Sequence, residues 1–99
     1  MLVSIIVPCY NEEAALPFFL REMQKIQEEM HRAYGCSVEL LFVNDGSQDR
    51  TLEVLRRFSK ETPLVRYLSF SRNFGKEAAM YAGLQHARGE YIAIMDADL

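Results

Sequence analysis

Two carboxylates one residue apart, Asp96 and Asp98, end an apolar run near the C-terminus of the sequence. In extended chain, residues i and i+2 point the same way and lie roughly 6.5 Å apart, and a small turn at Ala97 would bring the two side chains closer. Mg²⁺ is commonly held by one or two carboxylates together with waters and substrate phosphates. Two ionised carboxylates this close repel each other unless a cation neutralises them. We therefore favour a divalent-metal site over the alternative, which is a solvated acidic turn.

Three further polar clusters directly follow apolar runs, at residues 8–13 (PCYNEE), 44–47 (NDGS) and 71–73 (SRN). Each has a simpler interpretation than a binding site. Asp45 could have no role beyond capping the next helix, and Arg72 could be a solvated loop residue. Glu12 and Glu13 could simply be favoured by the positive end of a helix. Cys9 is interpreted as a small buried residue, because no cation lies near it in the sequence to activate a thiolate.

The elements that must position these clusters alternate between strands and helices. Four short apolar runs predict strands, at residues 3–7, 38–43, 64–70 and 91–95. The segments between them predict helices, at residues 16–30, 52–58 and 76–87. We expect Pro17 in the first turn of the first helix and Gly35 at its end. We expect Ser47 or Asp49 to cap the second helix.

A β-α-β-α-β-α-β order predicts an α/β fold with right-handed crossovers between parallel strands. The expected architecture is a three-layer, doubly wound, mainly parallel sheet, or the first half of one, formed by a single domain over residues 1–99. Ligands of such sheets bind at the carboxyl ends of the strands, near the point where the strand order reverses. The four polar clusters should therefore meet at one crevice.

Composition and missing motifs exclude several classes of protein. The net charge of −3 argues against nucleic-acid binding, which requires a basic face. No apolar stretch approaches the ~20 residues of a transmembrane helix, and no basic, apolar leader indicates a secretory signal. The two cysteines, which form no CxxC pair, favour the reducing cytoplasmic side. The sequence also lacks the GxGxxG, P-loop and GxSxG motifs.

With these residues in hand, the sequence resembles family 2 glycosyltransferases, which use nucleotide sugars on the glycosyltransferase-A fold. The matching segments are VSIIVPCYNEE, LLFVNDGSQDRT, SFSRNFGKEAAMYAGLQHARGEY and IMDADL, and they cover nearly the whole chain in the family's order. The stretch SRNFGKEAAMYAGL is most similar to the branch that makes polyprenyl-phosphate sugars, such as dolichol-phosphate mannose synthases and undecaprenyl-phosphate glucosyltransferases.

The resemblance implies roles for the residues of the polar clusters. Asp96 and Asp98 would be the family's DxD motif, the catalytic pair that holds Mg²⁺ or Mn²⁺ on the diphosphate. Asp45 would accept a hydrogen bond from the base. The full implied nucleotide-binding set is Pro8, Tyr10, Glu12, Asp45, Arg72 and Lys76.

The implied reaction is transfer of a hexose from a UDP- or GDP-sugar to an acceptor with inversion, while the divalent ion stabilises the leaving diphosphate. A polyprenyl phosphate is the favoured acceptor, because its oxygen is already anionic and needs no protein base. The alternatives are a glycan, cell-wall or lipid hydroxyl as acceptor, and a non-catalytic nucleotide-binding or receiver-like signalling domain. A receiver would need its acidic pair after the first strand and an Asp after the third, whereas Ser71-Arg72-Asn73 follows the third strand here.

The resemblance also implies that more of the enzyme exists than this chain. Family members continue with an acceptor-binding half, and the polyprenyl branch usually adds transmembrane helices. We therefore expect the sequence to be truncated after the DxD motif, inactive as a transferase by itself, and part of a membrane-associated protein on the cytoplasmic side. The truncated sheet should expose an edge that favours self-association.

Overall fold

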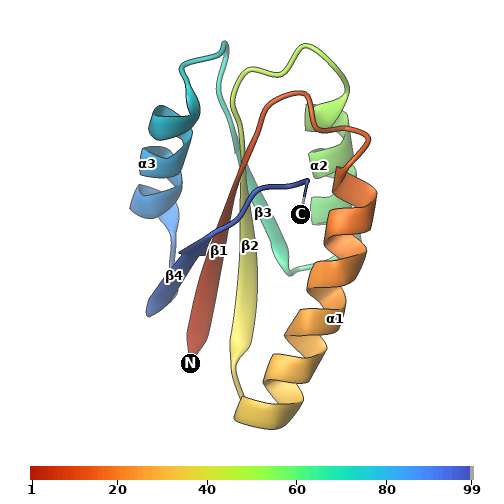
Figure 1. The fold of residues 1–99 in the computed structure, drawn as a ribbon, viewed down its shortest axis with the longest axis vertical. Coiled ribbons are helices and arrows are strands. Elements are labelled where there is room, and N and C mark those ends of the chain that lie inside the picture. The colour runs from red at the N-terminus through yellow and green to blue at the C-terminus, as the bar shows by residue number, and fades with distance from the viewer. Residues whose placement is uncertain (99) are drawn as a thin grey trace.

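The computed structural model describes residues 1–98, and Leu99 lies outside them. Seven elements alternate along the chain in the predicted order: β1 (Leu2–Cys9), α1 (Leu16–Tyr34), β2 (Ser37–Asn44), α2 (Thr51–Glu61), β3 (Val65–Ser69), α3 (Lys76–His86) and β4 (Tyr91–Ile94). The strands form one parallel sheet in the order β3-β2-β1-β4. Figure 1 shows α1 and α2 on one face of this sheet and α3 on the other. The predicted three-layer, doubly wound α/β fold is confirmed.

The two faces of the sheet differ in how they are packed. The α1/α2 face carries the larger apolar core, in which the Phe19 and Phe42 rings meet edge to face with centroids 5.9 Å apart. The α3 face carries a small cluster around Ile6, Val43 and Ala79. On that face a Cβ at Gly83 would lie 2.5 Å from Cγ2 of Ile6, so α3 approaches β1 more closely than any larger residue would allow.

The helix ends agree with the sequence in one case and differ in another. Helix α1 has Pro17 in its first turn and ends at Gly35, whose N–H donates to the His31 carbonyl at 2.9 Å. The N-cap residue of α2 is Arg50, which makes no side-chain capping bond, but one carboxylate oxygen of Asp49 accepts the N–H of Thr51, the first residue of the helix, at 2.9 Å. The other oxygen of Asp49 accepts the Glu13 N–H across the loop, and Ser47, the other candidate cap, accepts the Asn11 N–H.

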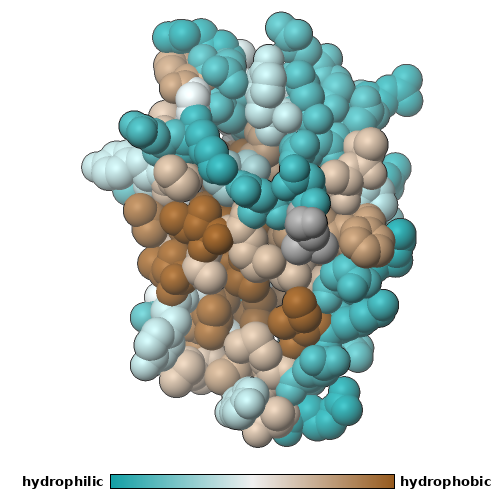
Figure 2. Space-filling view, viewed as in Figure 1, coloured by the Kyte–Doolittle hydropathy of each residue, from teal (hydrophilic) through white to brown (hydrophobic). Residues whose placement is uncertain are grey.

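The β4 edge of the sheet is uncovered. All four residues of β4 are exposed, including Tyr91 at 59% and both Ile92 and Ile94 at 44%. Figure 2 shows apolar side chains gathered over the part of the molecule where β4 and β1 lie. Among residues 1–98, no helix combines the length and apolar character needed to cross a bilayer.

Candidate functional site

A pocket of about 300 Å³ opens at the carboxyl ends of β1, β2 and β4. It lies where the strand order reverses between β1 and β4, which is the ordinary ligand site of an open parallel sheet. Its lining contains every predicted site residue except Arg72, together with Cys9 and Ala97, which were not predicted. The lining residues are Pro8, Cys9, Tyr10, Glu12, Asp45, Lys76, Asp96, Ala97 and Asp98. Three polar strand ends that are distant in the sequence therefore meet, together with the start of α3.

The loop after β1 is fastened to the loop after β2. Asn11, which has φ of 54°, donates its N–H to the Ser47 hydroxyl at 2.9 Å and accepts the Gln48 N–H at 2.8 Å through its side-chain oxygen. The next N–H, of Glu12, donates to the Thr51 hydroxyl at 2.9 Å. These bonds set the direction in which Tyr10 and Glu12 leave β1. Neither Asn11 nor Thr51 was predicted as a site residue, and the tolerance of Asn for positive φ is the one local signal that points to Asn11.

Cys9 lies beneath the pocket as a buried thiol that is 1% exposed. Burial raises the pKa of the Cys9 thiol far above its ordinary value, and the charges of Glu12 and Asp49 raise it further. The thiol is therefore protonated at neutral pH and is not a nucleophile. This agrees with the interpretation of Cys9 as a small buried residue.

Asp45 is 4% exposed and fastens the segment that leads into α3. One carboxylate oxygen accepts the Phe74 N–H at 2.7 Å, and the other accepts the Gly75 N–H at 3.0 Å and the Asn73 side-chain amide at 3.2 Å. Asp45 thus binds the start of the third helix, whereas the simpler interpretation had it capping the second. Each carboxylate oxygen can accept two hydrogen bonds, so the oxygen bound to Phe74 keeps acceptor capacity toward the pocket.

Arg72 is the predicted site residue that the structure does not bring into the pocket lining. Its guanidinium lies over the Phe74 ring, 4.0 Å from the ring centroid. That geometry is a cation–π contact at an exposed position, which holds the side chain against its own loop.

The acidic pair stands on a turn whose middle residue is buried. Ala97 is 2% exposed and belongs to the core on the α1/α2 face, while Asp96 and Asp98 on either side of it are exposed. The Lys76 ammonium at the start of α3 donates to Asp96 at 2.8 Å, and this hydrogen bond and the charge of Asp96 raise the pKa of Lys76. The side chains of Lys76 and Asp96 are each about 60% exposed, so the ion pair between them contributes little to stability. Either group can therefore exchange this contact for another partner.

The electrostatics of the pocket fit a hard divalent cation. Burial raises the pKa of the Glu12 carboxyl, and the negative charges of Asp98 and Asp96 raise it further. Carboxylate oxygens with an open side are the ligands that Mg²⁺ accepts alongside water and phosphate oxygens. Within residues 1–98, no group of three or more His, Cys, Asp or Glu side chains is arranged to hold a metal ion. A cation held by Asp96 and Asp98 would thus need further ligands, such as phosphate oxygens of a substrate.

The parallel, doubly wound sheet with a polar pocket at its strand ends places this domain among the α/β domains that bind ligands at the carboxyl ends of their strands. The family model for glycosyl transferase family 2 matches residues 4–99. The chain therefore belongs to glycosyl transferase family 2.

Several curated relatives match almost the whole chain. The prophage bactoprenol glucosyl transferase homolog of Escherichia coli K12 is 44% identical over 99 residues, which cover 100% of this chain and 31% of the relative. The dolichyl-phosphate beta-glucosyltransferase ALG5A of Trichomonas vaginalis is 42% identical over 97% of this chain and 30% of its own length. The chain thus spans about three tenths of the length of these relatives.

Solved structures of glycosyltransferases share the fold. The mannosyltransferase PcManGT from Pyrobaculum calidifontis, in complex with GDP-Man and Mn²⁺, superposes with a TM-score of 0.79 at 28% identity, over 97% of this chain and 27% of that one. Residues 1–349 of S. aureus TarS in complex with UDP give a TM-score of 0.78 at 25% identity, over 99% of this chain and 28% of that one. The sheet and helices of this chain therefore have the glycosyltransferase-A arrangement.

Proposed function

We propose that this chain is the donor-binding part of an inverting glycosyltransferase that moves a hexose from a UDP- or GDP-sugar to a polyprenyl phosphate. The observation that carries the proposal is the pocket at the strand-order reversal, which gathers the predicted nucleotide-binding residues other than Arg72 beside Asp96 and Asp98. The relatives named for bactoprenol and dolichyl phosphate support the choice of acceptor. The complexes of similar structures with GDP-Man and with UDP support the choice of donor.

The nucleoside would lie against the ends of β1 and β2. Pro8, Tyr10 and Glu12 would form the wall from β1, and Asp45 would accept a hydrogen bond from the base with the capacity that Phe74 leaves unused. Arg72 would reach a bound nucleotide only by leaving the Phe74 ring.

The diphosphate would lie toward β4 and the start of α3. Asp96 and Asp98 would hold Mg²⁺ or Mn²⁺, which in this reaction supplies positive charge to the departing diphosphate. Lys76 is already within reach of the acidic pair and would contribute a second cation there. A lipid phosphate acceptor brings its own anionic oxygen, so no protein base is required of this chain.

The acceptor-binding half of the enzyme would lie outside these 99 residues, since the relatives are about three times as long. We propose that the whole protein is membrane-associated with this domain on the cytoplasmic side, and that the 99-residue chain by itself transfers no sugar. Alone, it should also self-associate, because β4 is an edge strand with exposed apolar side chains that no element of residues 1–98 covers.

The proposal is tested by thermal unfolding of the chain with UDP, GDP and ADP, each with and without Mn²⁺. A ligand at about 100 times its dissociation constant stabilises the folded state by ~2.7 kcal/mol. For a domain of this size, that raises the melting temperature by roughly 10–20 °C. We expect a metal-dependent shift with UDP or GDP. No shift with any nucleotide, or a shift with ADP alone, would contradict the proposal.

The Asp98→Asn variant distinguishes the metal-dependent part of nucleotide binding from binding of the nucleoside. It should abolish the Mn²⁺-dependent gain in nucleoside diphosphate affinity and leave binding of free uridine or guanosine unchanged. The matched control is Glu90→Gln, which removes one carboxylate charge from an exposed position at the opposite end of β4. An Asp98→Asn variant that keeps the full Mn²⁺ effect would make the acidic pair a structural turn. In the complete enzyme, loss of this stabiliser should lower turnover by roughly 10²–10³.

A further inference from the structure

The strand that carries the acidic pair gains little from burial. All four residues of β4 are exposed, and β4 pairs with β1 alone, over four positions from Val3↔Tyr91 to Ile6↔Ile94. Hydrophobic packing of its own four residues therefore cannot fix where β4 lies, unlike for the central strands. The contacts at its two ends must do so. At the pocket end, the Met95 N–H donates to the Ile6 carbonyl at 3.0 Å, and Met95 and Ala97 pack against the apolar core on the α1/α2 face.

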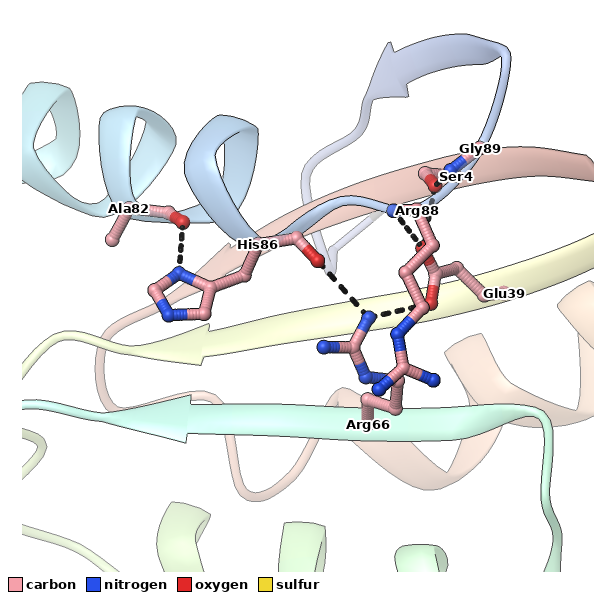
Figure 3. Close-up of polar contacts among 7 residues, drawn as sticks. All are labelled: Ser4, Glu39, Arg66, Ala82, His86, Arg88 and Gly89. Atoms are coloured by element: carbon pink, nitrogen blue, oxygen red, sulfur yellow. Dashed lines mark hydrogen bonds and ion pairs between the residues drawn. The ribbon is translucent and has the colours of Figure 1, made fainter.

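The other end of β4 is fastened by a buried polar network on the α3 face (Figure 3). At its centre is Glu39 of β2, which is 7% exposed. One oxygen of this carboxylate accepts the Arg66 guanidinium N–H at 2.7 Å, and the other accepts the Ser4 hydroxyl at 2.6 Å and the Arg88 backbone N–H at 2.8 Å. The carboxylate thus ties β1, β2 and β3 to the turn that enters β4.

Two further bonds hold the turn itself. The Ser4 hydroxyl accepts the Gly89 N–H at 2.8 Å, and the Arg66 guanidinium also donates to the His86 carbonyl at 3.1 Å. A Cβ at Gly89 would lie 2.6 Å from the Ser4 hydroxyl oxygen and 2.8 Å from the Leu2 carbonyl, so the turn sits directly on β1. The next N–H, of Glu90, donates to that Leu2 carbonyl at 2.9 Å and begins the pairing of β4.

Glu39 is ionised in this setting. Burial by itself would raise the pKa of the carboxyl, but the hydrogen bonds from Ser4, from the Arg88 backbone and from Arg66 outweigh burial and hold the pKa below its ordinary value. Removing one partner of a buried ion pair is strongly destabilising, because the remaining charge is left buried without a partner. The network therefore favours one arrangement of the turn over its alternatives.

We propose that Glu39, acting through Ser4 and Arg66, is a positioning residue for the acidic pair: it sets the place and register of β4, and so the place of Asp96 and Asp98 beside the pocket. The reasoning is that β4 is a short extended segment, so a displacement at its start is carried along the strand to its end. A slip of one residue would also turn every side chain of β4 to the opposite face. This inference rests on the proposed function for its effect on binding, but not for its effect on β4.

Glu39→Gln tests the proposal, because it keeps the shape of the side chain and removes the charge that Arg66 faces. Amide hydrogen exchange at Glu90 and Met95 reports on β4, and exchange at Asp45, whose N–H donates to the Cys9 carbonyl, reports on the centre of the sheet. We expect exchange at Glu90 and Met95 to accelerate roughly tenfold more than at Asp45, the scale of one lost charged hydrogen bond. Equal acceleration at all three amides would overturn the proposal.

The binding measurement uses UDP and GDP with and without Mn²⁺, and free uridine and guanosine. In Glu39→Gln the Mn²⁺-dependent gain should fall roughly tenfold while nucleoside affinity stays unchanged, since positioning acts on the acidic pair. The matched control is Val54→Ala, a buried position of α2 on the opposite face, which lowers stability without touching the network. Val54→Ala should change neither the Mn²⁺-dependent gain nor the nucleoside affinity. A full Mn²⁺-dependent gain in Glu39→Gln would overturn the proposal.

Two safeguards keep the test decisive. If Glu39→Gln does not fold, Ser4→Ala removes only the Gly89 link and the Ser4–Glu39 bond, and the same selective acceleration at Glu90 and Met95 is expected there. If the parent chain shows no Mn²⁺-dependent gain, the proposed function fails, while hydrogen exchange still decides whether Glu39 positions β4.

Discussion

β1 and β2 are buried on both faces of the sheet over most of their length, whereas every residue of β4 is exposed. The central strands are held by apolar contacts with helices on both sides, among them Phe42 against Phe19 on one face and Ile6 against Gly83 on the other. β4 is held by pairing with β1 and by the polar network around Glu39. The two regions of the sheet thus depend on different physical forces.

The same difference divides the pocket. The loops after β1 and β2, which would bind the nucleoside, are fastened to each other through Asn11, Ser47 and Thr51. The acidic pair after β4, which would bind the metal and diphosphate, has one exposed ion pair to Lys76. We infer that the loops proposed to bind the nucleoside are fixed by hydrogen bonds to each other. The position of the proposed metal site depends instead on how β4 is placed.

The largest expected effect comes from removing a central side chain. Phe42→Ala should lower the free energy of unfolding by about 3–5 kcal/mol, because it leaves a cavity between β2 and α1 where the ring is fully buried. On the edge, Ile94→Lys should change it by no more than about 0.5 kcal/mol, because the side chain is already exposed. Urea unfolding measures both values.

The edge variant also addresses self-association. A lysine in an exposed edge strand disfavours pairing with a second copy, so Ile94→Lys should shift the chain toward monomer in sedimentation velocity at matched concentrations. Phe18→Lys, at an exposed apolar position of α1 away from β4, is the control and should leave association unchanged. Equal association of the parent and Ile94→Lys would place the contact elsewhere.

An intermediate effect is expected at Asp45, where the centre of the sheet meets the start of α3. Asp45→Asn should lower stability by about 1–3 kcal/mol, because the amide would face the backbone donors of Phe74 and Gly75 with one acceptor fewer. It should weaken nucleotide binding by a similar amount with or without metal, as measured by calorimetry.

Asn73→Ala provides the comparison for Asp45→Asn, since it removes one of the donors to Asp45 and keeps the carboxylate. It should have the smaller effect on binding. If Asp45→Asn abolished only the metal-dependent part of the affinity, the division of the pocket into a nucleoside side and a metal side would be wrong.

The smallest effect is the pH dependence that arises from Glu39. Its pKa is depressed in the folded state, so its contribution to stability is full above the ordinary Glu pKa of about 4.3 and is lost as the pH falls through the folded value. The parent should therefore lose stability on acidification that Glu39→Gln does not lose. The measurement is the difference between the urea midpoints of the parent and Glu39→Gln, followed from pH 6 downward. Taking the difference isolates the contribution of Glu39 from that of Glu12, whose raised pKa makes stability change with pH in the opposite direction. A difference that is independent of pH would show that Glu39 gains nothing from its charge.

The order of elements and the end of the sheet at which the polar pocket lies could be predicted from the sequence. Apolar periodicity distinguishes strands from helices locally, and the alternation of the two leaves parallel pairing as the ordinary outcome. Polar residues that follow the strands must then meet at one edge, which is why the pocket lining contains all the predicted residues except Arg72. Arg72 was predicted as a site residue but lies outside the lining, because its side chain packs on an aromatic ring two residues away, Phe74.

The partners of the polar side chains could not be predicted, because nothing local specifies them. Asp45 reaches residues 28 to 30 positions away, and the Ser4 hydroxyl accepts a bond from Gly89 across 85 positions. A hydrogen bond has one partner at one distance and direction, whereas burial accepts any apolar side chain of suitable size. The sequence by itself therefore determined which surfaces are buried, which strands alternate with which helices, and where the polar ends gather. Only the register of the strands and the packing of α3 against the sheet decided that Glu39 would meet Arg66, Ser4 and the turn into β4, because that meeting requires three strands and a helix end to be in place at once.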